Sequence, residues 1–141
     1  MRDTGNGGKP SLAVLPFLNL TNDPNQEVYC AGLTDELISA LAGVPTVDVV
    51  ARSSAFQFKD QSIDVRTVGN ELGVDLILEG SVKMEGDETR ITAQLATVSD
   101  GFALWANSYN RAGEPGAGSV TQAQIAQKIV HALPLTPAVG R

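Results

Sequence analysis

The stretch LILEGSVKMEGDETRITAQLATVSDGFALWANSYNR, residues 76–111, decides the fold. Apolar and polar residues alternate along 90–97, the pattern of a half-buried strand. Strand-like segments at 76–84 and 102–109 flank it. Residues 85–88 are typical of a turn, and the Asp-Gly pair at 100–101 favours a hairpin. The stretch therefore predicts an antiparallel meander of three strands.

Upstream of the meander, strand patterns alternate with helix patterns. The apolar run at 12–17 is suited to a buried strand. Asp23 is placed to cap a helix, and Pro24 suits its first position. Leucines then repeat every four residues along one face of this helix, at Leu33, Leu37 and Leu41. Residues 47–58 are rich in β-branched and aromatic residues and predict a second strand.

Two further helices complete the pattern. Asp64 can cap one, and Gly73 is placed for its left-handed carboxyl-terminal cap. After a Gly- and Pro-rich loop at 110–118, Ser119 and Gln122 form a capping-box pattern for the last helix. Its apolar face comprises Ile125, Ile129 and Leu133. The predicted order is β-α-β-α-β-β-β-α, which favours the α/β class: a mixed sheet with flanking helices.

The length of 141 residues fits one domain. We expect a disordered tail at 1–10, a single α/β domain at 11–133 and a flexible tail at 134–141. No apolar stretch is long enough to span a membrane, and residues 1–10 lack the apolar core of a signal peptide. The sequence therefore predicts no direct membrane insertion by this chain.

Charge and residue usage exclude several classes of function. The net charge of −6, with no clustered basic residues, argues against nucleic acid as a partner. Cys30 and His131 are the single residues of their types, and they lie far apart in the sequence. Asp35 and Glu36 are adjacent and diverge by about 100° on a helix. We therefore predict no catalytic residues, no metal site, no cofactor and no enzymatic activity.

One polar cluster interrupts an apolar strand and is the candidate contact site. It consists of Arg52, Ser53 and Ser54, and we expect Asn19 and Thr34 to lie nearby. Arg52 could bind a carboxylate or phosphate of a ligand or partner at a cleft beyond the carboxyl ends of the strands. It could instead pair with an internal acid, which would be Asp35, Glu36 or Glu79. The sequence leaves both interpretations open.

Several segments together resemble the TolB amino-terminal-like domain, which is related to the FlgO-type domain. They are AVLPFLNL at 13–20, YCAGLTDEL at 29–37, ARSSAF at 51–56, NELGVDLILEGSVK at 70–83 and LWANSYNR at 104–111. The resemblance covers about 11–133. It places recurring family positions at Asn19, Gly32, Thr34, Arg52, Ser53, Gly80 and Trp105. Ala31 replaces a common family Asp, and AGEPGAG follows Arg111 where acids are frequent; contacts that use those acids are not expected here.

The resemblance implies a TolB amino-terminal fold and a non-catalytic accessory module. Such modules accompany bacterial class III adenylate cyclases, winged-helix regulators, protein kinases and tetratricopeptide-repeat proteins, and the family allows a periplasmic or a cytoplasmic location. Two hypotheses follow. The chain is a binding module that docks a protein partner or senses a small ligand for an attached effector domain, or it is the regulatory region of an adenylate cyclase. An intrinsic hydrolase or transferase is not favoured.

Overall fold

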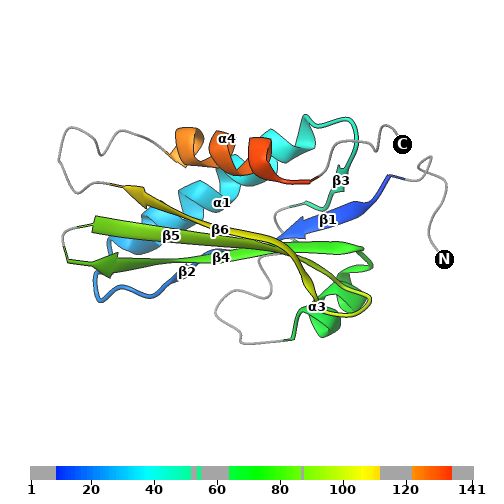
Figure 1. Ribbon diagram of the computed structural model, residues 1–141, viewed down its shortest axis with the longest axis horizontal. Coiled ribbons are helices and arrows are strands. Elements are labelled where there is room, and N and C mark those ends of the chain that lie inside the picture. Colours follow the sequence, from blue (N-terminus) through cyan, green and yellow to red (C-terminus); the bar gives the residue numbers. More distant parts are fainter. Residues whose placement is uncertain (1–8, 52–53, 55–63, 87, 112–121, 135–141) are drawn as a thin grey trace.

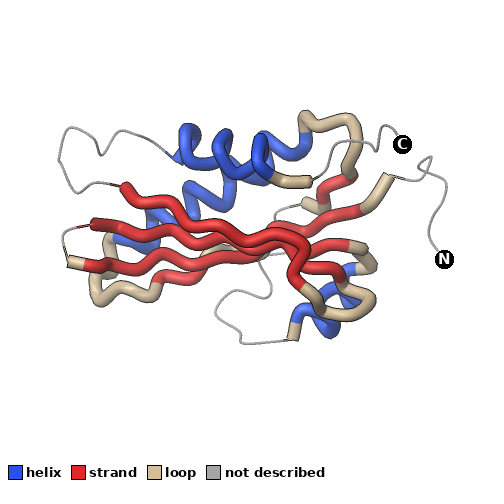
Figure 2. The backbone as a smooth tube through the Cα atoms, in the orientation of Figure 1, coloured by secondary structure: helices blue, strands red, loops and turns tan. Residues whose placement is uncertain are grey.

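The computed structural model describes residues 9–51, 54, 64–86, 88–111 and 122–134. Its six strands form one mixed sheet with helices on both sides (Figures 1 and 2). The strands are β1 (Ser11–Val14), β2 (Leu18–Asn19), β3 (Asp48–Val49), β4 (Leu76–Glu85), β5 (Glu88–Thr97) and β6 (Ala103–Arg111). The helices are α1 (Gln26–Ala42), α3 (Val65–Leu72) and α4 (Gln122–Ala132). The predicted α/β class with a mixed sheet is confirmed.

The strand order is β3-β1-β4-β5-β6, with β2 also paired to β4. β1 is parallel to both of its neighbours, β3 and β4. β4, β5 and β6 are antiparallel in succession, as expected for the meander. β1 and β2 pair with β4 one after the other, and residues 15–17 separate them. The sequence analysis missed β2, because two paired residues leave no periodic pattern.

α1 and α4 cover one face of the sheet, and α3 lies on the other (Figure 1). The predicted leucine face of α1 is buried, and each of its three leucines is 0% exposed. The apolar face predicted for α4 is buried as well. These side chains pack on β-strand residues of the same cluster, which include Leu12, Leu78, Ile91 and Leu95. The larger core of the domain therefore lies between the sheet and these two helices.

Two element boundaries differ from the sequence analysis. α1 begins at Gln26, and the side chain of its N-cap residue, Asn25, makes no capping hydrogen bond. Asp23 instead accepts a hydrogen bond of 2.9 Å from the Asn25 backbone N–H, in a turn that precedes the helix. Of the strand predicted at 47–58, the described residues contain β3, and Ser54 has helical geometry. In the register of β3 with β1, the end of β1 at Val14 falls at the level of Ala51, so a strand that continued well beyond Ala51 would lack a partner on β1.

The caps predicted for the second helix are confirmed. Asp64 accepts a hydrogen bond of 2.8 Å from the backbone N–H of Arg66. Gly73 ends α3 with a φ of 71°, a left-handed conformation that glycine adopts without steric cost. The capping box predicted at Ser119 lies outside the described residues. The described part of α4 begins at Gln122, the last residue of that pattern.

Gly80 has a steric reason to be glycine. A Cβ atom built on it would lie 2.4 Å from the Phe17 ring and 2.2 Å from the backbone oxygen of Thr92. The Phe17 side chain thus occupies the space above β4 that a residue with a side chain at position 80 would need. This close approach gives a packing explanation for one of the positions that the TolB resemblance singles out.

Candidate functional site

Asn19 organises the loop that connects β2 to α1. Its Oδ1 accepts hydrogen bonds from the backbone N–H and the hydroxyl of Thr21, at 2.9 and 2.6 Å. Its Nδ2 donates to the backbone oxygen of Asp23 at 3.1 Å. The Thr21 hydroxyl in turn accepts a hydrogen bond from the Asp23 backbone N–H. This network fixes the loop and gives Asn19 a structural role; the ligand contact predicted for it stays a prediction.

Thr34 is fully buried in α1 and links the helix to the chain between β1 and β2. Its hydroxyl accepts a hydrogen bond of 3.0 Å from the Phe17 backbone N–H and donates one of 2.8 Å to the Cys30 backbone oxygen. Without this acceptor the buried Phe17 amide would lose its partner, which is costly. Thr34 thus contacts Phe17 at one end of the segment 17–19, and Asn19 forms its other end. The proximity of both residues to Arg52 stays a prediction.

The remaining candidate residues follow β3. Ser54 is exposed, and its backbone N–H donates to the Ala51 oxygen at 3.1 Å. Arg52 and Ser53 lie outside the described residues, so the contact or ion pair predicted for Arg52 stays a prediction. Of its three candidate acids, Asp35 and Glu36 are exposed on α1, while Glu79 is half-buried on β4.

A polar surface covers the side of β4, β5 and β6 opposite to α1 and α4. In the register of these strands, Glu79 pairs with Gln94, and Ser81 pairs with Thr92, which pairs with Ser108. We call these five residues the open face. All five are partly exposed, and among the described residues α3 is the one helix on this side of the sheet (Figure 1). α3 packs against Ile77 and Val98, beyond one end of the open face.

Cross-strand hydrogen bonds hold the open face in order. The Gln94 side-chain amide donates to Glu79 Oε2 at 3.2 Å. The hydroxyls of Thr92 and Ser108 lie 3.4 Å apart, and either can donate to the other. Three exposed leucines flank the face: Leu18 and Leu20 beside β4, at 40% and 57% exposure, and Leu104 on β6, at 53%. The hydrogen bonds order the polar side chains, and contact with another surface would remove the apolar area of these leucines from water.

Glu79 is the titratable group of the open face whose environment is most unusual. Burial of the carboxylate raises its pKa above the ordinary value of 4.5, and the hydrogen bond from Gln94 opposes part of this shift. Such a group is more easily neutralised than a surface glutamate.

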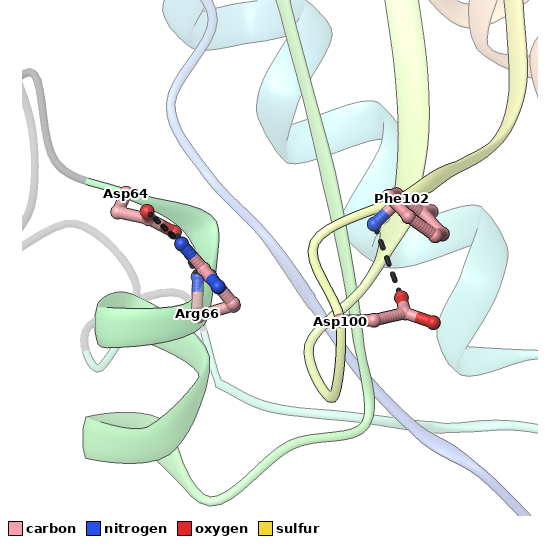
Figure 3. Close-up of polar contacts among 4 residues, drawn as sticks. All are labelled: Asp64, Arg66, Asp100 and Phe102. Carbon is pink, nitrogen blue, oxygen red and sulfur yellow. Dashed lines mark hydrogen bonds and ion pairs between the residues drawn. The ribbon is translucent and has the colours of Figure 1, made fainter.

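Two further polar contacts lie at the start of α3 and in the β5–β6 turn (Figure 3). Asp64 accepts hydrogen bonds from Arg66 and forms an ion pair of 3.0 Å with its guanidinium, which lowers the pKa of Asp64. Asp100 accepts hydrogen bonds from the Thr97 hydroxyl and, at 3.1 Å, from the Phe102 N–H, and these lower its pKa. Both carboxylates are held by local structure and therefore act as caps.

The described residues line two surface grooves. One, of about 440 Å³, lies beside the amino ends of β1 and β4, between the end of α3 and the end of β5. Its polar lining includes Asn70, Asp75, Thr97 and Ser99. The other, of about 530 Å³, follows the outer side of α4 from Ala123 to Lys128. Neither groove is at the carboxyl ends of the strands, where the cleft beside Arg52 is predicted; that cleft involves undescribed residues and stays a prediction.

The single Cys and His residues occupy structural positions. Cys30 is buried in the core and His131 lies in the last turn of α4, as expected. Trp105 is half-buried against the main core. In the part of the chain that the structure describes, no three His, Cys, Asp or Glu residues cluster as metal ligands would. No described helix combines the length and apolarity of a membrane span.

The sequence analysis did not identify the open face as a site. Thr92 and Gln94 belong to the alternating segment 90–97, and Glu79 enters only as a candidate partner of Arg52. The alternation that predicts a strand gives no information on what lies over its polar side. One signal was available in principle. The pattern places a Glu and a Gln at positions that face each other across a hairpin centred on 86–87, and such cross-strand pairs interact.

Comparison with known proteins finds a curated relative that is much longer than this chain. The chain is 41% identical over 125 residues to "Putative adenylate cyclase 3" of Rhizobium meliloti, in a match that covers 89% of this chain. The chain spans about a fifth, 21%, of the length of that curated relative. This relative is thus a much longer protein that contains a similar domain.

Solved structures share the fold at low sequence identity. Lipoprotein GNA1162 from Neisseria meningitidis has a TM-score of 0.58 at 18% identity, covering 88% of this chain and 99% of that one. TolB from Acinetobacter baumannii has a TM-score of 0.55 at 16% identity, covering 86% of this chain and 26% of that one. The TolB-like fold expected from the sequence resemblance is confirmed.

A family model describes most of the sequence. It matches residues 8–129, which include all the described helices and strands except the end of α4. Its description is that of the second domain of a HilA/YgeH-like transcriptional regulator. The match covers well over half of the chain, and the chain therefore belongs to the family of second domains of HilA/YgeH-like transcriptional regulators.

Proposed function

We propose that this chain is a non-catalytic interaction module, which docks a protein partner or an attached effector domain of a bacterial signalling protein. The observation that carries the proposal is the open face: an ordered polar surface on a rigid sheet, with exposed leucines at its margins. The opposite face of the same strands is committed to the core and cannot bind a partner without unfolding. The open face is therefore the surface of the described sheet that is suited to recognition.

Electrostatics supports a protein partner rather than nucleic acid. The chain carries a net charge of −6, and phosphate backbones attract clustered positive charge. Membership in a family of regulator domains is compatible with this, because the match is to a second domain. We propose that other parts of such a regulator contact DNA, and that this module transmits or receives a signal.

A titration of the isotopically labelled chain with the remaining domains of its own protein tests the proposal. We expect chemical-shift changes at Ser81, Thr92 and Gln94, and unchanged shifts for the leucines of α1. Thr92→Lys should weaken binding at least about tenfold, a loss of about 1.4 kcal/mol. Ser39→Lys is the matched control, since Ser39 is exposed on α1 and away from the open face. Shift changes confined to α1 and α4 would contradict this assignment.

A second candidate is the regulatory region of a class III adenylate cyclase. The favouring observation is the 41% identity to a domain-sized part of the Rhizobium protein. Under this proposal the isolated chain makes no cyclic AMP, whereas deletion of the domain changes the activity of the full-length cyclase. Turnover of nucleotides or esters by the purified chain, abolished by a point mutation within it, would refute the absence of catalysis in both candidates.

A further inference from the structure

β6 ends the sheet opposite to β3, and the two edges differ in kind. β3 has two residues, whereas β6 has nine, Ala103–Arg111. Among the described residues, no strand pairs with the outer side of β6. Proteins commonly protect such edges with proline, charged side chains or a very short strand. The sequence of β6, ALWANSYNR, has no proline and one charged residue at its end.

The hydrogen bond of Ser108 shows which backbone groups of β6 point outward. Its N–H donates to the Asn107 side chain at 2.9 Å, so it is directed away from β5. Because backbone groups alternate along a strand, those of Ala106 and Asn110 point outward as well. The odd-numbered residues use their backbone groups in pairing with β5. β6 therefore presents a regular row of outward donors and acceptors, one of which is covered by Asn107.

The outward row is self-complementary in an antiparallel arrangement. With a two-fold axis at Asn107, Ala106 faces Ser108 of the partner subunit, and the two exchange hydrogen bonds once the Asn107 side chain releases the Ser108 N–H. Trp105 then faces Tyr109 of the partner subunit, and cross-strand aromatic pairs are favourable. Both aromatic side chains are half-buried and lie on the helix-covered side of the sheet. A pairing about one axis forms each of these contacts twice.

Charge also favours a second copy. The chain contains 16 acidic residues, but none lies in β6. Two such strands can approach without direct repulsion between like charges, although the proteins are both acidic. We propose that two copies of this chain associate through antiparallel pairing of their β6 strands, centred on Asn107, into one continuous sheet. This proposal does not depend on the open face or on the proposed function.

Cysteine crosslinking of the full 141-residue chain tests the register. Residues that face each other at such an axis have Cα atoms about 4.5 Å apart, which permits a disulfide. Asn107→Cys should therefore give a disulfide-linked dimer under mild oxidation. Ala103→Cys is the matched control, because the two copies of position 103 would lie about 27 Å apart at ~3.4 Å per residue. The wild-type chain should not crosslink, since its one cysteine, Cys30, is buried.

Sedimentation equilibrium of two charge variants tests the association itself. Asn107→Lys puts two like charges opposite each other and should raise the dimer dissociation constant at least about tenfold. Asn110→Lys adds the same charge to the same strand away from the axis and should change that constant less than about threefold. Circular dichroism should confirm that both variants are folded.

Two results would overturn the proposal. One is a wild-type chain that stays monomeric at all accessible concentrations while Asn107→Cys fails to crosslink. The other is a dimer in which Ala103→Cys crosslinks as well as Asn107→Cys, which would indicate another interface. The proposal would also be overturned if a foreign peptide strand bound to β6 while the chain itself remained monomeric.

Discussion

The helix-covered face and the open face belong to the same three strands, but their side chains have different tasks. On the covered face Ile91 and Leu95 of β5 are completely buried beneath α1 and α4. One residue along the same strand, Thr92 and Gln94 are partly exposed and bond to neighbouring strands. Alternate residues of one strand therefore have different roles. Substitutions of the exposed set should have little effect on the stability of the fold, whereas substitutions of the buried set should lower it.

The largest expected effect is on the covered face. Leu37 is 0% exposed, and Leu37→Ala should lower the free energy of unfolding by about 2–5 kcal/mol, because it removes a buried side chain and leaves a cavity. Chemical denaturation measures the change. Glu36→Ala, at an exposed position of the same helix, is the control and should have little effect. A loss of a few tenths of a kcal/mol for Leu37→Ala would mean that the helix does not depend on this face.

Thr34→Val tests a polar contact on the covered side. Valine has nearly the same shape, but it removes the acceptor of the Phe17 N–H and leaves a buried donor unsatisfied. We expect a loss of about 1–3 kcal/mol in the free energy of unfolding. Thermal and chemical denaturation should agree on the change. An unaltered stability would show that the Phe17 amide finds another partner.

The same substitution on the open face sharpens the comparison. Thr92→Val removes a hydroxyl whose partner, Ser108, remains accessible to water. We expect a change within about 0.5 kcal/mol in the free energy of unfolding, typical of surface positions. The two Thr→Val variants should be measured under identical conditions. Equal losses in both would remove the distinction between the faces.

The smallest expected effect depends on pH. The pKa of Glu79 is raised in the folded chain, so this group stabilises the fold below its unfolded pKa, and that contribution is lost as the pH rises through the folded pKa. Glu79→Gln should therefore be slightly more stable than the wild type at neutral pH, and the difference should vanish as the pH falls below about 4.5. Denaturation of both proteins across this range measures it. A difference that grows at low pH would have the wrong sign.

Sequence reasoning succeeded where a pattern is repeated over many residues. The leucines of α1, the alternation of β5 and the cap at Asp64 each predicted a feature that the structure contains. It failed where tertiary pairing decides the outcome. The strand predicted at 47–58 depends on a partner, and β1, which ends at Val14, pairs with two of its described residues. The start of α1 depends on the preceding turn, in which the Asp23 carboxylate accepts a hydrogen bond from the Asn25 N–H.

The candidate site was less predictable than the fold. Asn19 and Thr34 were selected as contacts, and the structure gives both of them internal hydrogen bonds. The sequence alone does not distinguish a polar residue that bonds to the backbone of its own chain from one that binds a ligand. The open face had the opposite problem, because its residues look like ordinary solvent-exposed strand positions. A surface of this kind is identified by the absence of a covering element, which depends on the tertiary structure and has no local signal in the sequence.

The break between β1 and β2 has a consequence for insertions and deletions. From Val14 to Leu18 the chain advances four residues, while the paired positions on β4, Leu78 and Ser81, are three apart. The extra residue works as a bulge and reverses the side to which odd and even positions point. Deleting one residue from 15–17 would leave three residues opposite three and restore a regular strand, with Leu18 still opposite Ser81. A second deletion would bring Leu18 opposite Gly80 and turn it to the helix-covered side, so we expect this segment to tolerate the loss of one residue but not of two.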